Sequence, residues 1–172
     1  MSLLEISKKY KTDKESIHNY ISKYYIKSFE PYKKTANLLL EIGVDEGQSL
    51  EMWNEYFDKA KIVGVDVADR GYIATSTNIE FRLGKAQKED TFKNLHNIDI
   101  IVDDGSHKLN HQIKTFDILF PKLNDHGVYI IEDIKDIENN INKFKNLTKN
   151  VKVYDFRKLT GRKDSVIVEI RK

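Results

Sequence analysis

The stretch NLLLEIGVDEGQSLEMWNEYF, residues 37–57, joins a short apolar run to a glycine-bearing turn and then to a helical pattern. The run at 37–42 predicts a buried strand, and the apolar spacing that follows predicts a helix over 48–57. The same patterns continue along the chain, with strands expected at 62–67, 79–83, 99–104 and 127–133 and helices at 107–120 and 135–148. Strands that alternate with helices indicate βαβ units and a mostly parallel sheet.

The two ends of the chain add to this outline. Residues 151–156 and 165–170 predict two last strands, and the connection between them is too short for a parallel crossover, so they should pair antiparallel. The segment KESIHNYISKYYIKSFEPY, residues 14–32, predicts one tyrosine-rich helix before the first strand. We therefore expect a single α/β domain over 1–172, with a helical segment at 1–34 and a seven-stranded sheet whose last strand is antiparallel.

Composition limits the classes of function. The 172 residues are 40% apolar and 33% charged, a globular balance in a chain long enough for one domain. The net charge of +2 gives no strong attraction to nucleic acid, and the absence of cysteine excludes disulfides and thiolate metal sites. No apolar run approaches the roughly 20 residues that span a bilayer, and the N-terminal MSLLEISKKYKTDK lacks a secretory apolar region. These features predict a cytoplasmic enzyme or binding protein.

The turn after the first strand has the character of a nucleoside-binding loop. Gly43 and Gly47 allow a tight turn and close approach to a ligand, and Asp66, at the end of the second strand, can accept both hydroxyls of a ribose. The turn lacks the GxGxxG pattern, and the carboxylates of Glu41 and Asp45 would repel a pyrophosphate. They suit a ligand with an amino group and a positive sulfur. The alternative for this turn is an ordinary strand-to-helix loop.

Acidic residues and a histidine follow two later strands. Asp103, Asp104 and His107 follow the fourth strand, and Glu132 and Asp133 follow the fifth. Because neighbouring parallel strands end at the same edge of a sheet, these side chains should converge there. A divalent cation with oxygen ligands would relieve their repulsion, and a nearby histidine can take a proton from a coordinated hydroxyl. The alternative is that the acids cap helices and the histidine is solvated.

Several motifs resemble those of the metal-dependent sugar O-methyltransferases, of which the macrocin and mycinamicin enzymes are the best known. VDDGSH at 102–107, HQIKTFDILFP at 111–121 and YIIED at 129–133 carry the resemblance. The opening at 9–25, with its Thr-Asp-Lys motif, and the ending at 155–170 are similar to the shorter members of that group. This resemblance implies a class I S-adenosylmethionine-dependent methyltransferase with a Rossmann-like, doubly wound fold, acting on a sugar hydroxyl.

The resemblance also implies roles for individual residues. Those expected to bind the cofactor, S-adenosylmethionine, are Glu41, Gly43, Gly47, Ser49, Asp66, Gln87 and Asp103. Those expected to hold Mg²⁺ or Mn²⁺ are Asp104, Glu132 and Asp133, with His107 as general base and Asp104 beside it in the catalytic group. Those expected in an N-terminal lid or against the substrate are Thr12, Asp13, Lys14, His18, Tyr20 and His111. The acceptor is expected to be a nucleotide sugar, a glycan or a glycosylated metabolite, with no nucleic acid or membrane insertion, and a homo-oligomer is left open.

One departure from the family pattern concerns adenine. Relatives often carry Gly-Asp-Gln after the third strand, whereas this chain has Gly84-Lys85-Ala86-Gln87, so adenine recognition is expected to rest on Gln87 and backbone groups. Two other functions are kept as alternatives: a cofactor-binding or scaffold protein that has lost catalysis, and a nicotinamide-dependent oxidoreductase, against which the missing GxGxxG counts.

Overall fold

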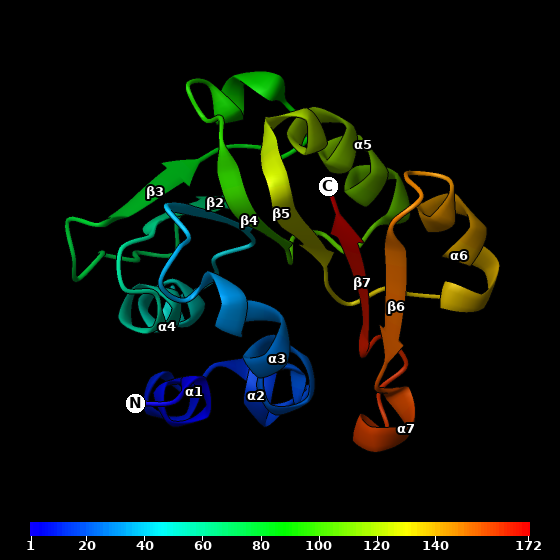
Figure 1. The fold of residues 1–172 in the computed structure, drawn as a ribbon, viewed down its shortest axis with the longest axis horizontal. Coiled ribbons are helices and arrows are strands. Elements are labelled where there is room, and N and C mark those ends of the chain that lie inside the picture. The colour runs from blue at the N-terminus through cyan, green and yellow to red at the C-terminus, as the bar shows by residue number, and fades with distance from the viewer.

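The computed structural model describes residues 1–172, and its centre is a seven-stranded sheet in the order β3-β2-β1-β4-β5-β7-β6 (Figure 1). The strands are β1 (Leu38–Ile42), β2 (Lys61–Asp66), β3 (Ile79–Leu83), β4 (Ile98–Asp103), β5 (Leu123–Ile131), β6 (Val151–Asp155) and β7 (Val166–Arg171). The first five strands pair in parallel, and β7 pairs antiparallel with both β5 and β6. The predicted Rossmann-like sheet with its antiparallel last strand is therefore confirmed.

Helices cover both faces of this sheet. They are α1 (Leu3–Tyr10), α2 (Asp13–Ser16), α3 (Ile26–Phe29), α4 (Gln48–Tyr56), α5 (Leu109–Leu119), α6 (Ile137–Lys145) and α7 (Arg157–Thr160). Figure 1 shows α1 to α4 on one side of the sheet and α5 and α6 on the other. Successive strand residues face opposite layers, so that Leu39 belongs to the hydrophobic core that contains Trp53 of α4, and Leu40 to the one that contains Phe116 of α5. Burial on both faces explains why these strands read as continuous apolar runs.

The N-terminal segment differs from the single helix expected over 14–32. Helix α2 ends at Ser16, Asn19 adopts a left-handed conformation with φ +56°, and a π-helical turn at Ile21–Tyr25 then leads into α3. Asparagine tolerates that conformation better than most residues. The break turns Tyr20 and Tyr25 into the interior, where both are fully buried.

The helices after β4 and β5 both begin later than predicted, and α6 spans Ile137–Lys145 rather than 135–148. Helix α5 starts at Leu109 rather than 107, because His107 is left-handed with φ +52°. At its other end the helix is followed by a 3₁₀ turn at Phe120–Lys122 that contains Pro121.

No helix of the structure is both long and apolar enough to cross a bilayer.

Candidate functional site at the carboxyl edge of the sheet

A cavity of about 810 Å³ opens where β1 to β4 end. Its walls come from Gly43 after β1, Asp66 at the end of β2, the loop 84–87 after β3, and the loop 104–107 after β4. Strand order reverses between β1 and β4, and ligands of open α/β sheets bind in the crevice outside that point. The volume lies within the range of pockets for small molecules and cofactors.

The glycine turn after β1 touches the end of β4. Gly43 has φ +86°, and a Cβ atom there would lie 2.0 Å from the backbone oxygen of Asp104. Gly47 also has φ +86°, and the ring of Tyr72 lies against it, 2.2 Å from where a Cβ would be. Gly43 thus lets two strand ends approach closely at the cavity, whereas Gly47 is covered by an aromatic ring.

Asp66 both lines the cavity and fixes the glycine turn. One carboxylate oxygen accepts hydrogen bonds from the backbone N–H groups of Val44 at 2.8 Å and Asp45 at 3.2 Å, and the other accepts from Ala68 at 3.0 Å. Burial opposes ionisation of Asp66, but these backbone donors outweigh it and lower the pKa of the carboxyl. An ionised carboxylate at this position is suited to accept hydroxyl groups of a ribose.

The residues expected to bind the cofactor divide into two groups. Those that line the cavity are Gly43, Asp66 and Gln87, and those that do not are Glu41, Gly47, Ser49 and Asp103. Gln87 donates from Nε2 to the Thr115 hydroxyl at 3.2 Å, which orients its amide. Asp103 is buried behind the cavity, where burial raises its pKa to about 7. The sequence did not single out the cavity-lining cations Arg70, Lys85 and Lys114, which lie in polar loops and on an exposed helix face.

Asp104, His107 and Asp133 form a group that fits a divalent cation. Each offers one ligand atom, and these atoms lie within 4.8 Å of one another. His107 Nδ1 is buried without a hydrogen-bond partner. His107 and Asp133 are both left-handed, with φ +52° and +54°, a strained backbone that clusters at functional sites. Burial, followed by the neighbouring charge of Asp104, raises the pKa of Asp133 to about 6. A cation would relieve that repulsion, and carboxylate oxygens suit Mg²⁺ or Mn²⁺.

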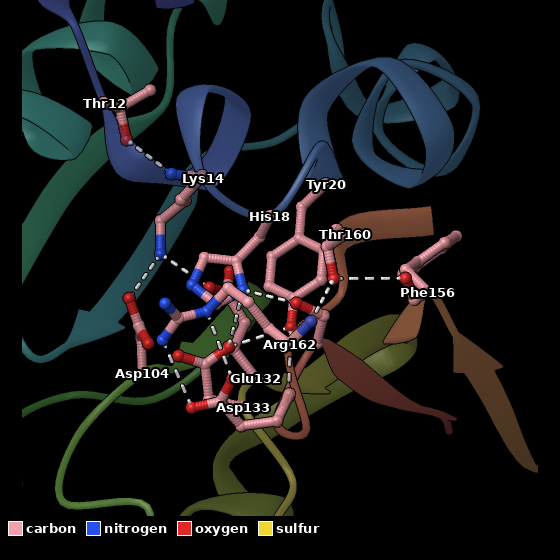
Figure 2. Close-up of polar contacts among 12 residues, drawn as sticks. Thr12, Lys14, His18, Tyr20, Asp104, Glu132, Asp133, Phe156, Thr160 and Arg162 are labelled. Atoms are coloured by element: carbon pink, nitrogen blue, oxygen red, sulfur yellow. Dashed lines mark hydrogen bonds and ion pairs between the residues drawn. The ribbon is translucent and has the colours of Figure 1, made fainter. Parts of the chain in front are cut away.

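Glu132, the third expected metal ligand, is bound by other residues. Tyr25 donates its hydroxyl to Glu132 Oε1. Lys14 Nζ lies 2.9 Å from Glu132 Oε2 (Figure 2). The same ammonium lies 2.6 Å from Asp104 Oδ2 and 3.2 Å from Glu41 Oε1. Burial disfavours the charge of Lys14, but the three carboxylates raise its pKa well above the usual value. Sequence reasoning assigned Lys14 to a lid and did not connect it with these acids.

Other residues of the N-terminal segment lie against Asp133. Tyr20 donates its hydroxyl to Asp133 Oδ1 at 2.8 Å, and His18 Nδ1 lies 3.5 Å from the same oxygen (Figure 2). His18 Nδ1 also lies 3.0 Å from the Ser165 hydroxyl. The rings of His18 and Tyr20 stack with centroids 4.8 Å apart. Thr12 caps α2 by accepting a hydrogen bond from the backbone of Lys14 at 3.4 Å.

The remaining two residues expected in the lid or substrate site, Asp13 and His111, make no contact with these acids. Asp13 is exposed at the start of α2. His111 lines the cavity, with Nδ1 2.8 Å from the Ser106 hydroxyl.

Comparison with known proteins gives clear relatives. The chain is 36% identical over 134 residues to the 8-demethyl-8-alpha-L-rhamnosyl tetracenomycin-C 2'-O-methyltransferase of Streptomyces olivaceus, a match that covers 72% of this chain and 35% of that protein. It is 30% identical over 148 residues to the mycinamicin VI 2''-O-methyltransferase of Micromonospora griseorubida, covering 77% of this chain and 36% of that protein. The match thus spans little more than a third of each relative.

Solved structures agree on the fold. MycE methyltransferase from the mycinamycin biosynthetic pathway, in complex with Mg, SAH and mycinamycin VI, superposes with a TM-score of 0.82 at 22% identity, over 100% of this chain and 53% of that one. No protein-family model matches the sequence. The similarity to these O-methyltransferases extends over 72% and 77% of the chain, which assigns the chain to their family. The chain belongs to the family of S-adenosylmethionine-dependent O-methyltransferases related to the mycinamicin VI and rhamnosyl tetracenomycin-C enzymes.

Proposed function

We propose that this protein transfers a methyl group from S-adenosylmethionine to a sugar hydroxyl with the help of Mg²⁺. The observation that carries the proposal is the continuity of the two sites. The cavity at the switch point of the sheet ends at Asp104 and His107, which with Asp133 form the group suited to a divalent cation. One cavity therefore joins a nucleoside-binding wall to a site for deprotonating a hydroxyl.

The cofactor would lie along the first three strand ends. S-adenosylmethionine supplies an electrophilic methyl group on a positive sulfur. In the proposal, Asp66 accepts the ribose hydroxyls, Gln87 and the backbone of 84–87 contact adenine, and Gly43 permits close approach near the methionine portion. Glu41, Gly47, Ser49 and Asp103, which the sequence also assigned to the cofactor, do not line the cavity.

The hydroxyl would be prepared by the group at the other end of the cavity. A bound Mg²⁺ supplies positive charge that lowers the pKa of an acceptor hydroxyl. Asp104 and Asp133 would hold it, with Glu132 as the third acid of the family pattern. His107 then takes the proton from the acceptor hydroxyl, and the alignment of hydroxyl and methyl group supplies much of the rate.

The acceptor and the N-terminal segment complete the proposal. We place the acceptor sugar, free, nucleotide-linked or part of a glycoside, beside His107 and His111. Segment 1–34 acts as a lid in one domain with the core at 35–172. Its residues Lys14, His18 and Tyr20 contact the acids at the ends of β4 and β5, and Thr12 caps the helix that carries Lys14. We further propose a cytoplasmic enzyme that does not act on nucleic acid.

The test is calorimetric titration with S-adenosylhomocysteine, repeated with Mg²⁺ and with EDTA. We expect micromolar binding, and a separate Mg²⁺ signal that Asp104→Ala removes because one of the carboxylates of the cation site is lost. Asp58→Ala, an exposed acid remote from the cavity, should preserve both signals. If S-adenosylhomocysteine binds under none of these conditions, the scaffold alternative takes precedence and nicotinamide cofactors are titrated next.

Asp66→Ala should weaken S-adenosylhomocysteine binding by about 10- to 100-fold, the effect of losing hydrogen bonds to a charged group. The loss has two sources, since Asp66 would contact the ribose and also holds Val44 and Asp45 in the turn. The same calorimetry measures it, with Asp58→Ala as the matched control. Unchanged affinity would mean that Asp66 is not the ribose acid.

A further inference from the structure

A second cavity, of about 450 Å³, opens where the segment after β5 meets the loop before β7. The backbone N–H of Ile134 donates to the carbonyl of Val166 at 3.2 Å, which holds these two segments together. The residues that line this cavity are Lys135, Asp136, Arg162, Lys163 and Asp164, and none of them lines the larger cavity. We refer to it as the basic pocket, because cations outnumber acids in its wall.

The basic pocket adjoins the proposed cation site. The hydroxyl of Tyr20 lies 2.8 Å from Asp133 Oδ1 and 3.5 Å from the backbone oxygen of Asp164. One hydroxyl therefore contacts both a carboxylate of the cation site and the wall of the pocket. Lys135 follows Asp133 by two residues, so at most about 7 Å separates their Cα atoms.

The two carboxylates of the basic pocket already have protein partners. Arg162 Nε lies 3.3 Å from Asp164 Oδ1, and the side-chain amide of Asn139 donates to both oxygens of Asp136 at 3.0 Å. Figure 2 shows Arg162 beside His18, and burial, followed by the charge of Arg162, lowers the pKa of His18. A ligand that spans the pocket and the cation site would therefore pass the guanidinium.

Lys135 and Lys163 supply the unbalanced positive charge. Both residues are exposed, and neither ammonium lies within ion-pair distance of a carboxylate, unlike the guanidinium of Arg162. Solvated lysines are common on protein surfaces, but these two come from separate segments and line one concave site. The pocket thus presents two ammonium groups that have no carboxylate partner in the protein.

A phosphate ester is the ligand chemistry that fits these cations. The guanidinium binds two phosphate oxygens at once, and the ammonium groups bind them as point charges. In the proposed reaction the acceptor hydroxyl lies at the cation site, so another substituent of the same sugar ring extends away from it. The basic pocket is the neighbouring concave surface where such a substituent meets positive charge. A neutral glycoside would leave these cations without a partner.

We infer that the basic pocket binds a phosphate group carried by the acceptor, so that the substrate is a sugar phosphate ester and not a neutral glycoside. This inference rests on the proposed function and narrows its acceptor. Lys135 and Lys163 determine specificity in this assignment, and they belong neither to the larger cavity nor to the cation group.

The test compares binding of glucose 1-phosphate and of methyl glucoside to the full chain, measured by ligand-observed nuclear magnetic resonance. EDTA is present throughout, so that the phosphate cannot bind through a metal ion. The phosphate ester should bind at least about tenfold more tightly, the effect of hydrogen bonds to charged groups. The double variant Lys135→Met/Lys163→Met should lose this preference.

The matched control is Lys59→Met/Lys149→Met, which removes the same charge from two exposed lysines outside the pocket and should keep the preference. Uridine diphosphate glucose, titrated alongside, distinguishes two sources of the phosphate. Tighter binding than that of glucose 1-phosphate indicates a diphosphate-linked acceptor, and equal or weaker binding indicates a monoester.

The inference is overturned if the wild type binds glucose 1-phosphate no more tightly than methyl glucoside. It is also overturned if the preference survives in Lys135→Met/Lys163→Met, or if the control variant loses it to the same extent, since the effect would then come from net charge alone. Binding of S-adenosylhomocysteine by the wild type tests the methyltransferase proposal separately. Intact cofactor binding without a preference for phosphate would reject this inference and leave that proposal standing.

Discussion

His107→Ala should lower the rate of methyl transfer by about 10²- to 10⁴-fold, the usual contribution of a general acid or base. The imidazole lies at the cavity within the group formed with Asp104 and Asp133, and its Nδ1 is free of protein partners. The cofactor wall lies at other strand ends, so S-adenosylhomocysteine affinity should stay within about threefold of wild type. Transfer of a labelled methyl group to a panel of free, nucleotide-linked and glycosidic sugars measures the rate, and calorimetry measures the affinity.

The matched control for this change is His96→Ala, an exposed histidine remote from the cavity, which should leave both quantities unchanged. Full activity of His107→Ala would remove the general-base role. Loss of S-adenosylhomocysteine binding together with activity would instead assign His107 to shaping the cavity, because a base acts on the acceptor and not on the bound product cofactor.

Gly43→Ala should destabilise the fold by roughly 3 kcal/mol or more, from a strained backbone and a steric clash together. The φ of +86° disfavours any side chain, and the added Cβ would meet the backbone oxygen of Asp104 at 2.0 Å. Neither partner is a flexible side chain, so the end of β4 must move away from β1. The melting temperature should fall by about 2–4 °C for each kcal/mol in a domain of this size, measured by thermal unfolding.

Gly161→Ala separates the two causes. Gly161 has φ +71°, but no atom lies within 4 Å of the position of a Cβ, so only the left-handed penalty of about 1–2 kcal/mol applies. Equal losses of stability in the two variants would show that the close approach of β1 and β4 has no energetic weight. A larger loss in Gly43→Ala, with weaker S-adenosylhomocysteine binding, would tie the turn to the cavity.

The sheet could be predicted from sequence because its signals are local. Buried strands read as short apolar runs, and the short connection before β7 permits only an antiparallel partner. The prediction of a single helix over residues 14–32 was wrong because the conformation of this segment depends on contacts with residues far away in the sequence. Tyr20 and Tyr25 donate hydrogen bonds to Asp133 and Glu132, respectively, which lie more than a hundred residues away in the sequence. The left-handed conformation of Asn19 interrupts the helix before these tyrosines. The spacing of apolar residues along the sequence does not reveal such long-range contacts.

The sequence predicted where the site lies, but not which of its side chains contact one another. Strand ends locate Asp66, Asp104 and His107 at one edge, since parallel strands finish together. The sequence does not reveal which acids are occupied by protein partners. A buried lysine cannot be distinguished from a solvated one in a charged N-terminal stretch, so the pairing of Lys14 with Glu132 required the structure.

The contacts of the N-terminal segment also set an order of folding. Lys14 is 118 residues from Glu132, and His18 is 147 residues from Ser165, so these pairs close very long loops. Long-range contacts form late because the entropy of loop closure must be overcome before they stabilise the chain. The segment that precedes the sheet in the chain should therefore dock last, onto a core already assembled from β1 to β7. Refolding followed at Trp53, which packs against Tyr25 and Phe29, should report that final docking as a separate slow step.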